Sequence, residues 1–136
     1  MKKLFPLLLV LVSSPVLADW VKISGYANTA SPASEKFVDM RAIRQRGPMN
    51  TMRRVWEISN LAKGAPYKVL SIKSNVEYDC KNRRVRVLEE SNLSEHRAQG
   101  ENLTLAGHDL KPGNWSDINR GSVSETIFYR VCPNDD

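Results

Sequence analysis

Two cysteines stand behind an N-terminal segment with the composition of an export signal, and together these features constrain the fold most. The chain starts with the positive run Met1-Lys2-Lys3, continues with an apolar stretch at 4–12, and reaches Val16-Leu17-Ala18, a suitable site for signal peptidase. The apolar stretch is too short to cross a bilayer core of about 30 Å as a helix. We therefore expect residues 1–18 to be a signal peptide that is cleaved between Ala18 and Asp19; an uncleaved anchor is the alternative.

Export also predicts how the two cysteines are used. An oxidising compartment favours a disulfide between Cys80 and Cys132. The lysine doublet and short apolar stretch suit a bacterial periplasm, so we expect a periplasmic or secreted protein. Because Asp19 follows the cleavage site, no cysteine is in place for lipidation, and no transmembrane segment is expected after cleavage.

The mature chain, 19–136, has the length of a single domain and carries a mild positive charge. Without Lys2 and Lys3, 18 basic side chains face 15 acidic ones, a net charge of +3. This charge permits attraction to acidic proteins or polysaccharides, but it is well below the positive charge typical of nucleic-acid-binding proteins.

The first half of the mature chain predicts short strands joined by polar segments. Patterning and turn residues indicate strands at 20–27, 37–38 and 51–61, a loop at 28–34, and turns at 46–48 and 63–66. Asp39 is placed to cap one helical turn that runs through Ile43. In the strand at 51–61, Met52, Trp56 and Ile58 form an apolar face, opposite a polar face with Arg53, Glu57 and Ser59. We expect Trp20, Trp56 and Trp115 to lie in the core.

Residues 67–93 predict a β-hairpin with its turn at Lys81-Asn82. One register matches apolar and charged residues at the same time. It pairs Val76 with Val87, Tyr78 with Val85, Glu77 with Arg86, Asp79 with Arg84, and Lys73 with Glu90. Beyond the hairpin, a short strand is expected at 102–106 and a turn at 110–114.

The C-terminal segment predicts a helix from Val123 to about Val131. Ser122 and Glu125 have the spacing of a capping box, in which each side chain bonds to the other residue's backbone N–H. Val123, Ile127, Phe128 and Val131 form the apolar stripe. Because Cys132 follows this stripe and Cys80 ends the best-patterned strand, their disulfide would fasten the helix to the sheet. The expected fold is α+β: an antiparallel sheet with a C-terminal helix packed on it.

Residue patterns of known enzymes are mostly missing. The sequence has no HExxH, CxxC, GxSxG or glycine-rich phosphate loop, so we expect neither an enzyme nor a cofactor. His96 and His108 lie in loops beside acids and are expected to be ordinary surface residues. A small hydrolase or metal-binding protein that uses these two histidines is the alternative.

Two clusters of basic residues are the candidate partner-binding sites. Arg84 and Arg86 are matched to acids in the hairpin, which leaves the hairpin tip and an arginine-rich segment that is poor in nearby acids. The candidates are Lys81, Arg83, Arg41, Arg44, Arg46, Arg53 and Arg54. Few aromatic residues are interleaved with them, so single-stranded nucleic acid is not expected.

The order and spacing of several short motifs resemble the surface-adhesin protein E family of exported proteobacterial proteins. These motifs are Phe37-Val38-Asp39, Ile43-Arg44, Gly47, Val55-Trp56, Glu77-Tyr78-Asp79-Cys80, Arg83, Gly100, Trp115, Gly121-Ser122-x-x-Glu125 and Cys132. The resemblance covers about 20–132. It implies an antiparallel sheet of about six strands, a C-terminal helix and a strand-to-helix disulfide. It also implies a role in binding host or extracellular-matrix proteins.

Two functions remain open from the sequence. The first is an exported, non-enzymatic, adhesin-E-like binding module whose basic surface holds an acidic protein or glycan. The second is a periplasmic accessory protein that binds a bacterial partner through a sheet edge, without host contact. A homodimer is compatible with either.

Overall fold

The computed structural model describes residues 18–23, 33–47, 50–62, 68–104 and 112–133. Several sequence predictions lie outside these residues. They are nearly all of the signal peptide, the strand end at 24–27, the loop at 28–32, the turn at 63–66, the strand end at 105–106 and His108.

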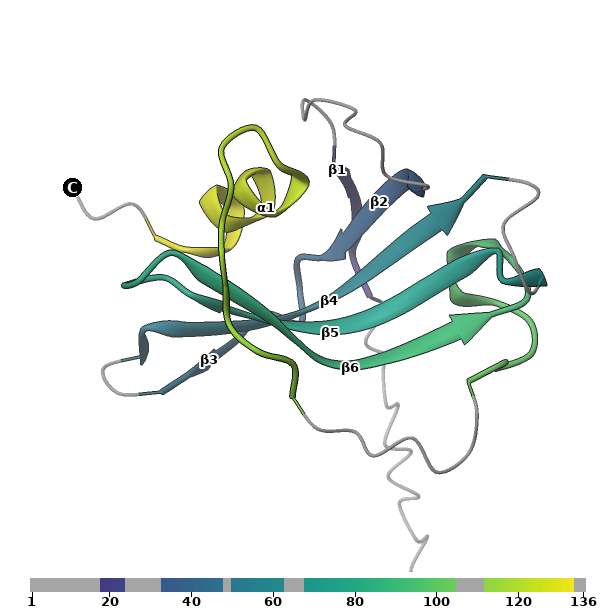
Figure 1. The fold of residues 1–136 in the computed structure, drawn as a ribbon, viewed down its shortest axis with the longest axis horizontal. Coiled ribbons are helices and arrows are strands. Elements are labelled where there is room, and N and C mark those ends of the chain that lie inside the picture. The colour runs from purple at the N-terminus through teal and green to yellow at the C-terminus, as the bar shows by residue number, and fades with distance from the viewer. Residues whose placement is uncertain (1–17, 24–32, 48–49, 63–67, 105–111, 134–136) are drawn as a thin grey trace, which may run out of the picture.

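One antiparallel sheet of seven strands forms the body of the described chain (Figure 1). The strands are β1 (Trp20–Ile23), β2 (Ala33–Asp39), β3 (Arg44–Arg46), β4 (Met52–Leu61), β5 (Ser71–Asp79), β6 (Arg84–Leu93) and β7 (Ser116–Asp117). Their order is β1-β2-β4-β5-β6-β7, and β3 also pairs with β4. The predicted α+β class and antiparallel sheet are confirmed, with β3 and β7 as strands that the sequence did not predict.

The helix α1 (Val123–Val131) packs on one face of the sheet (Figure 1). Its N-cap is Ser122, whose hydroxyl oxygen accepts a hydrogen bond from the Glu125 N–H at 3.1 Å. The capping box is only half formed, because the Glu125 carboxylate accepts from the Gly121 N–H at 3.2 Å instead of from Ser122. The predicted helix and its boundaries are confirmed.

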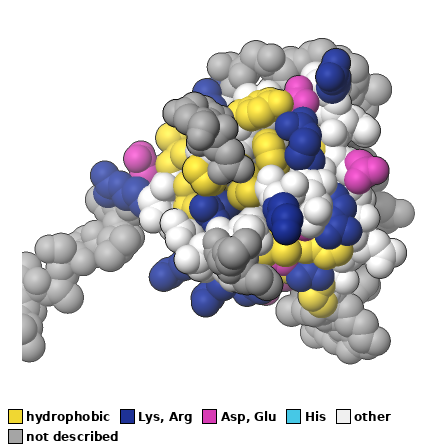
Figure 2. Space-filling view, turned by 90° about the vertical axis from the view of Figure 1, so that its left-hand side faces the viewer, with side chains coloured by type: hydrophobic (Ala, Val, Ile, Leu, Met, Phe, Trp, Pro, Cys, Tyr) yellow, Lys and Arg dark blue, Asp and Glu magenta, His cyan; other side chains and the backbone are white. Residues whose placement is uncertain are grey.

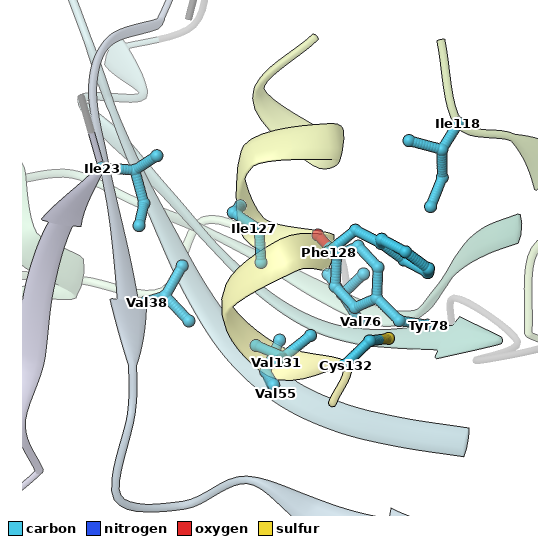
Figure 3. Packing of buried hydrophobic residues seen from close by; sticks show 10 residues of the cluster. All are labelled: Ile23, Val38, Val55, Val76, Tyr78, Ile118, Ile127, Phe128, Val131 and Cys132. Atoms are coloured by element: carbon cyan, nitrogen blue, oxygen red, sulfur yellow. The ribbon is translucent and has the colours of Figure 1, made fainter. Parts of the chain in front are cut away.

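The core lies between α1 and the sheet. Ile127, Phe128 and Val131 of the helix are buried, and in Figure 3 Ile127 and Val131 lie near Val38 and Val55 of the central strands. The helix ends at its C-cap Cys132, whose disulfide to Cys80 joins Cα atoms 5.5 Å apart. The predicted disulfide between helix and sheet is confirmed.

The predicted β5–β6 register is confirmed near the turn and wrong at the far end. Val76 pairs with Val87, Tyr78 with Val85, Glu77 with Arg86, and Asp79 with Arg84. An irregularity between Asn75 and Val76 shifts the ladder by one residue, so Lys73 lies opposite Ser91 and not Glu90. A β-bulge of this kind adds one residue to one strand, and alternation alone does not reveal it.

The faces of β4 alternate as predicted, and Ile58 on the predicted apolar face is buried, but the core under α1 lies on the face that was expected to be polar. Val55 packs under α1 and shares its face with Arg53 and Glu57, which are both buried. The opposite face carries Trp56, and all three tryptophans are half-buried, so their predicted place in the core is wrong.

The helical turn predicted at 39–43 is also wrong. Asp39 instead accepts a hydrogen bond from the Arg41 N–H at 3.1 Å, a local bend that leads into β3. Aspartate side chains bond readily to the backbone two residues on, which competes with helix formation. Beyond β6, Asn102 forms only an isolated bridge to Leu93 instead of the predicted strand.

Candidate functional site

An open pocket of about 690 Å³ lies where the β5–β6 turn, the start of β4 and the end of α1 meet. We call it the hairpin pocket. Its lining residues are Asn50, Thr51, Arg53, Cys80, Lys81, Arg83, Phe128, Tyr129, Cys132 and Pro133. The Cys80–Cys132 disulfide is part of the wall, so the bond that fastens α1 also shapes this site. The pocket brings together three of the predicted basic residues.

Arg53 is the most unusual residue of the hairpin pocket. It lies on the α1 side of β4 and is only 8% exposed. Its Nη1 donates to the Met52 carbonyl at 3.0 Å and also to the Asn50 carbonyl. Among the described residues no carboxylate forms an ion pair with it. Buried charges in proteins are normally paired, so this guanidinium should attract an anion that enters the pocket.

Lys81 and Arg83 form the tip side of the hairpin pocket, and they differ. Lys81 is exposed and makes no ion pair with any described residue. Arg83 was expected to be unpaired, and this is wrong. Its Nη2 contacts Glu125 Oε2 at 3.2 Å, and its Nη1 donates to the Tyr129 hydroxyl at 3.0 Å. Arg83 is therefore mainly a link between hairpin and helix.

Aromatic side chains from α1 form the other wall. The rings of Phe128 and Tyr129 meet edge to face, with centroids 5.6 Å apart. The Arg83 guanidinium carbon lies 5.1 Å from the Phe128 ring centroid, and Tyr129 is 54% exposed. Figure 2 views this end of the molecule, where Lys and Arg side chains lie beside exposed hydrophobic ones and few acidic side chains are seen. Phe128 and Tyr129 were not predicted as site residues, because helical spacing indicates only which residues face the core.

The other predicted basic residues lie elsewhere. Arg41 is exposed and contacts Asp19 at 3.8 Å. Arg44, Arg46 and Arg54 lie on the sheet face opposite α1, because they share rungs with Glu77 and Asp79 rather than with Val76 and Tyr78. The cluster at 41–54 is thus divided between the two faces of the sheet.

Of the two histidines in the alternative site, the structure describes only His96. His96 begins the short helix η3 (His96–Ala98) and is exposed, and its Nε2 lies 2.9 Å from the Leu61 carbonyl oxygen. No group of three or more metal-ligating side chains occurs in the described ranges. No helix within those ranges has the length and apolar character to cross a membrane.

A comparison with protein-family models gives the decisive match: the model of surface-adhesin protein E covers residues 20–133. The chain belongs to this family. Its fold, with a disulfide between the sheet and the helix, is thus that of an adhesin-type binding module.

One solved structure supports the fold. The crystal structure of Haemophilus influenzae protein E, crystal form II, matches this chain with a TM-score of 0.58, and the two sequences are 14% identical. The match covers 82% of this chain and 95% of that one. A search of curated protein sequences found no match.

Proposed function

We propose that this chain is an exported, non-enzymatic binding module that holds an acidic segment of a partner protein in the hairpin pocket. The observation that supports this most is Arg53, a buried guanidinium with no carboxylate partner among the described residues. Lys81 adds a second cation at the rim.

The pocket also suggests which acidic segments fit. A carboxylate between Arg53 and Lys81 would gain charge-assisted hydrogen bonds. The rings of Phe128 and Tyr129 would then cover an apolar or aromatic side chain next to that carboxylate. The ligand is therefore an acidic sequence with an aromatic or apolar neighbour, rather than a run of acids alone.

Export is part of the proposal. The sequence of 1–18 supports a signal peptide cleaved before Asp19, and the family is one of surface proteins. Without a lipidation cysteine at position 19, the protein would be secreted or remain in the periplasm. Protease treatment of intact cells distinguishes these locations, since a periplasmic protein is spared until the outer membrane is opened.

The second candidate is an accessory protein that binds a partner, or a second copy of itself, through a sheet edge. β7 covers only Arg84 and Val85 of β6, so within the described residues no strand pairs with the outer side of 88–91. An open edge of this kind can accept another strand. Binding by this edge would depend on backbone bonds and would be insensitive to Lys81.

A labelled peptide tests the proposal. The probe is a fluorescein-labelled peptide that repeats Glu-Glu-Phe, and the readout is fluorescence anisotropy. Lys81→Gln should weaken binding several-fold, and Arg53→Met should weaken it more. Lys68→Gln is the matched control, because Lys68 is exposed and lies just before the start of β5, at the end of that strand away from the hairpin pocket. Binding should also weaken as salt rises, because exposed charges are screened over about 8 Å at physiological ionic strength.

Thermal melting of each variant separates loss of the site from loss of the fold. Equal binding by Lys81→Gln and Lys68→Gln, with both variants folded, would reject the hairpin pocket as the site.

A further inference from the structure

Five arginines lie on the sheet face opposite α1, and we call this surface the arginine face. Its members are Arg44 and Arg46 of β3, Arg54 of β4, and Arg84 and Arg86 of β6. They lie on two alternate rungs of the sheet, which share this face. One rung runs Arg44, Arg54, Glu77, Arg86, and the other runs Arg46, Met52, Asp79, Arg84, Asp117.

The carboxylates on this surface neutralise it only in part. Glu77 is 3% exposed and binds two arginines, with contacts of 2.7 Å to Arg54 and 2.6 Å to Arg86. Asp79 is fully buried and contacts Arg84 at 3.0 Å. The acids therefore lie at the bottom of the surface, and the guanidinium groups lie above them. Arg44 and Arg46 are exposed and form no ion pair with a described residue.

The paired arginines are held in place before any ligand arrives. The Trp115 ring stacks with two of them, its centroid 4.4 Å from the Arg86 guanidinium carbon and 5.2 Å from that of Arg84. Glu77 fixes Arg54 and Arg86 from below. Ordering a long side chain on binding has an entropic cost, so guanidinium groups that are already fixed bind an anion at a smaller cost.

Sheet geometry spaces these charges as a flat grid. Adjacent strands lie about 4.8 Å apart, and alternate residues on one strand lie about 6.8 Å apart. A grid of cations suits an extended chain that carries an anion on many of its units. Arginine also presents a planar fork of donors that matches the oxygens of an oxyanion in pairs.

The surface lacks what a protein partner normally requires. Protein interfaces depend on buried apolar or aromatic anchors. Among the described residues, the exposed large hydrophobic side chains are Val87 and Tyr129, which lie on the α1 side of the sheet and on α1 itself. The aromatic ring of the arginine face, Trp115, is already stacked on arginines.

We propose that the arginine face binds a sulfated polysaccharide. This site is separate from the hairpin pocket, since Arg53 lies on the other face of β4 and Lys81 lies in the β5–β6 turn. Arg44 and Arg46 extend the grid beyond the structural pairs and supply its unneutralised charge. Arg84 and Arg86, which the sequence assigned to structural pairing alone, here serve both purposes.

Binding to low-molecular-weight heparin, measured by isothermal titration over a range of salt concentrations, tests the proposal. Arg44→Gln with Arg46→Gln should weaken binding at least tenfold at low salt and reduce the slope of log affinity against log salt by about two. The fold should persist, because both side chains are exposed and neither forms an ion pair with a described residue. The matched control, Lys68→Gln with Arg130→Gln, removes the same charge from exposed sites outside this surface.

Each further result decides for or against the proposal. Retained heparin binding by Lys81→Gln, and loss of binding to desulfated heparin, support it. Equal losses in the two double variants would show attraction to net charge alone and would overturn it. Equal or tighter binding of a single-stranded DNA of the same charge would also overturn it.

Discussion

At the residue scale, the chain buries acids between arginines instead of exposing them on the sheet. Burial alone would raise the pKa of Glu77, but hydrogen bonds from the Arg54 and Arg86 guanidinium groups outweigh it and hold that pKa below its ordinary value of 4.5. The charged form of Glu77 is thus the form that the fold requires.

The first prediction concerns this carboxylate. Glu77→Gln should lower the free energy of unfolding by about 1–3 kcal/mol at neutral pH, because the two guanidinium groups lose a charged acceptor. Since the folded-state pKa is lowered, the contribution of Glu77 is complete above pH 4.5 and is lost as pH falls through that pKa. Urea unfolding measured from pH 7 to pH 3 should show that the free energy of unfolding falls less steeply with falling pH in the variant than in the natural protein.

A charge swap provides the control. Glu77→Arg with Arg86→Glu restores that pair but places the new cation against Arg54, which is bonded to Glu77 at 2.7 Å. Compared with Glu77→Arg alone, the swap should therefore restore only part of the lost free energy of unfolding. Full rescue would show that Arg54 does not share this carboxylate.

A second buried network predicts alkaline sensitivity. The Tyr78 hydroxyl donates to Glu57 Oε1 at 2.6 Å, and Lys36 holds the other Glu57 oxygen at 2.7 Å. Burial, with the adjacent Glu57 charge, raises the pKa of Tyr78 well above 10.0. The neutral phenol thus stabilises the fold up to a pH near the ordinary tyrosine pKa of 10.0, and this stability is lost as the pH rises further. Tyr78→Phe should cost about 1–3 kcal/mol at neutral pH and remove most of the decline in melting temperature above pH 10.

At the element scale, α1 is fastened to the hairpin at two points, the disulfide and Arg83. The disulfide joins residues 52 positions apart, and Arg83 reaches Glu125 and Tyr129 across the hairpin pocket. The disulfide holds the C-terminal end of α1, and Arg83 reaches both Glu125 in the first turn and Tyr129 in the last, so the two links together hold the helix along its length.

Loss of the disulfide should therefore be costly. Cys132→Ser should lower the free energy of unfolding by about 2–5 kcal/mol, the usual effect of removing a native bridge from a small domain. Arg83→Ala should have a smaller effect, because its ion pair with Glu125 is partly exposed. A melting temperature unchanged in Cys132→Ser would contradict the proposed role of the link.

The elements that could be predicted from sequence are those whose signals are local. The β5–β6 turn register and α1 follow from alternation, charge matching and a cap within a few residues. The bulge at Leu88 of β6 and the strand β3 were not predicted, because both depend on how strands pair with their neighbours in the sheet. The partners of Arg83 were not predicted for the same reason, since they lie about 40 residues further along the chain.

At the scale of the whole molecule, the sequence predicted basic candidate residues but not how the fold groups them. Arg53 and Arg54 are consecutive, yet they lie on opposite faces of β4, in the hairpin pocket and on the arginine face. Alternation predicts this division, but the irregular pattern at Arg54-Val55 concealed which face the helix covers. The buried, unpaired state of Arg53 has no sequence signal, because it depends on packing.

Export makes a prediction about the intact protein. Mass spectrometry of the exported protein without reduction should show Asp19 as the N-terminus and a mass two hydrogens below that of the dithiol. The structure is compatible with such an end, since Asp19 N lies 3.2 Å from the buried carboxylate of Asp39, which would pair with a new ammonium group. Retention of Met1 would contradict cleavage, and alkylatable thiols would contradict the disulfide.

The most direct test of the central claim is a titration of the labelled protein with the Glu-Glu-Phe peptide, followed through backbone amide chemical shifts by NMR. The account predicts that shifts concentrate in the residues around the hairpin pocket, at 50–53, 80–83 and 128–133. In Lys81→Gln these shifts should be clearly smaller at the same peptide concentration, because binding is several-fold weaker. Shifts concentrated instead along 88–91 of β6 would contradict the account and favour binding through the sheet edge.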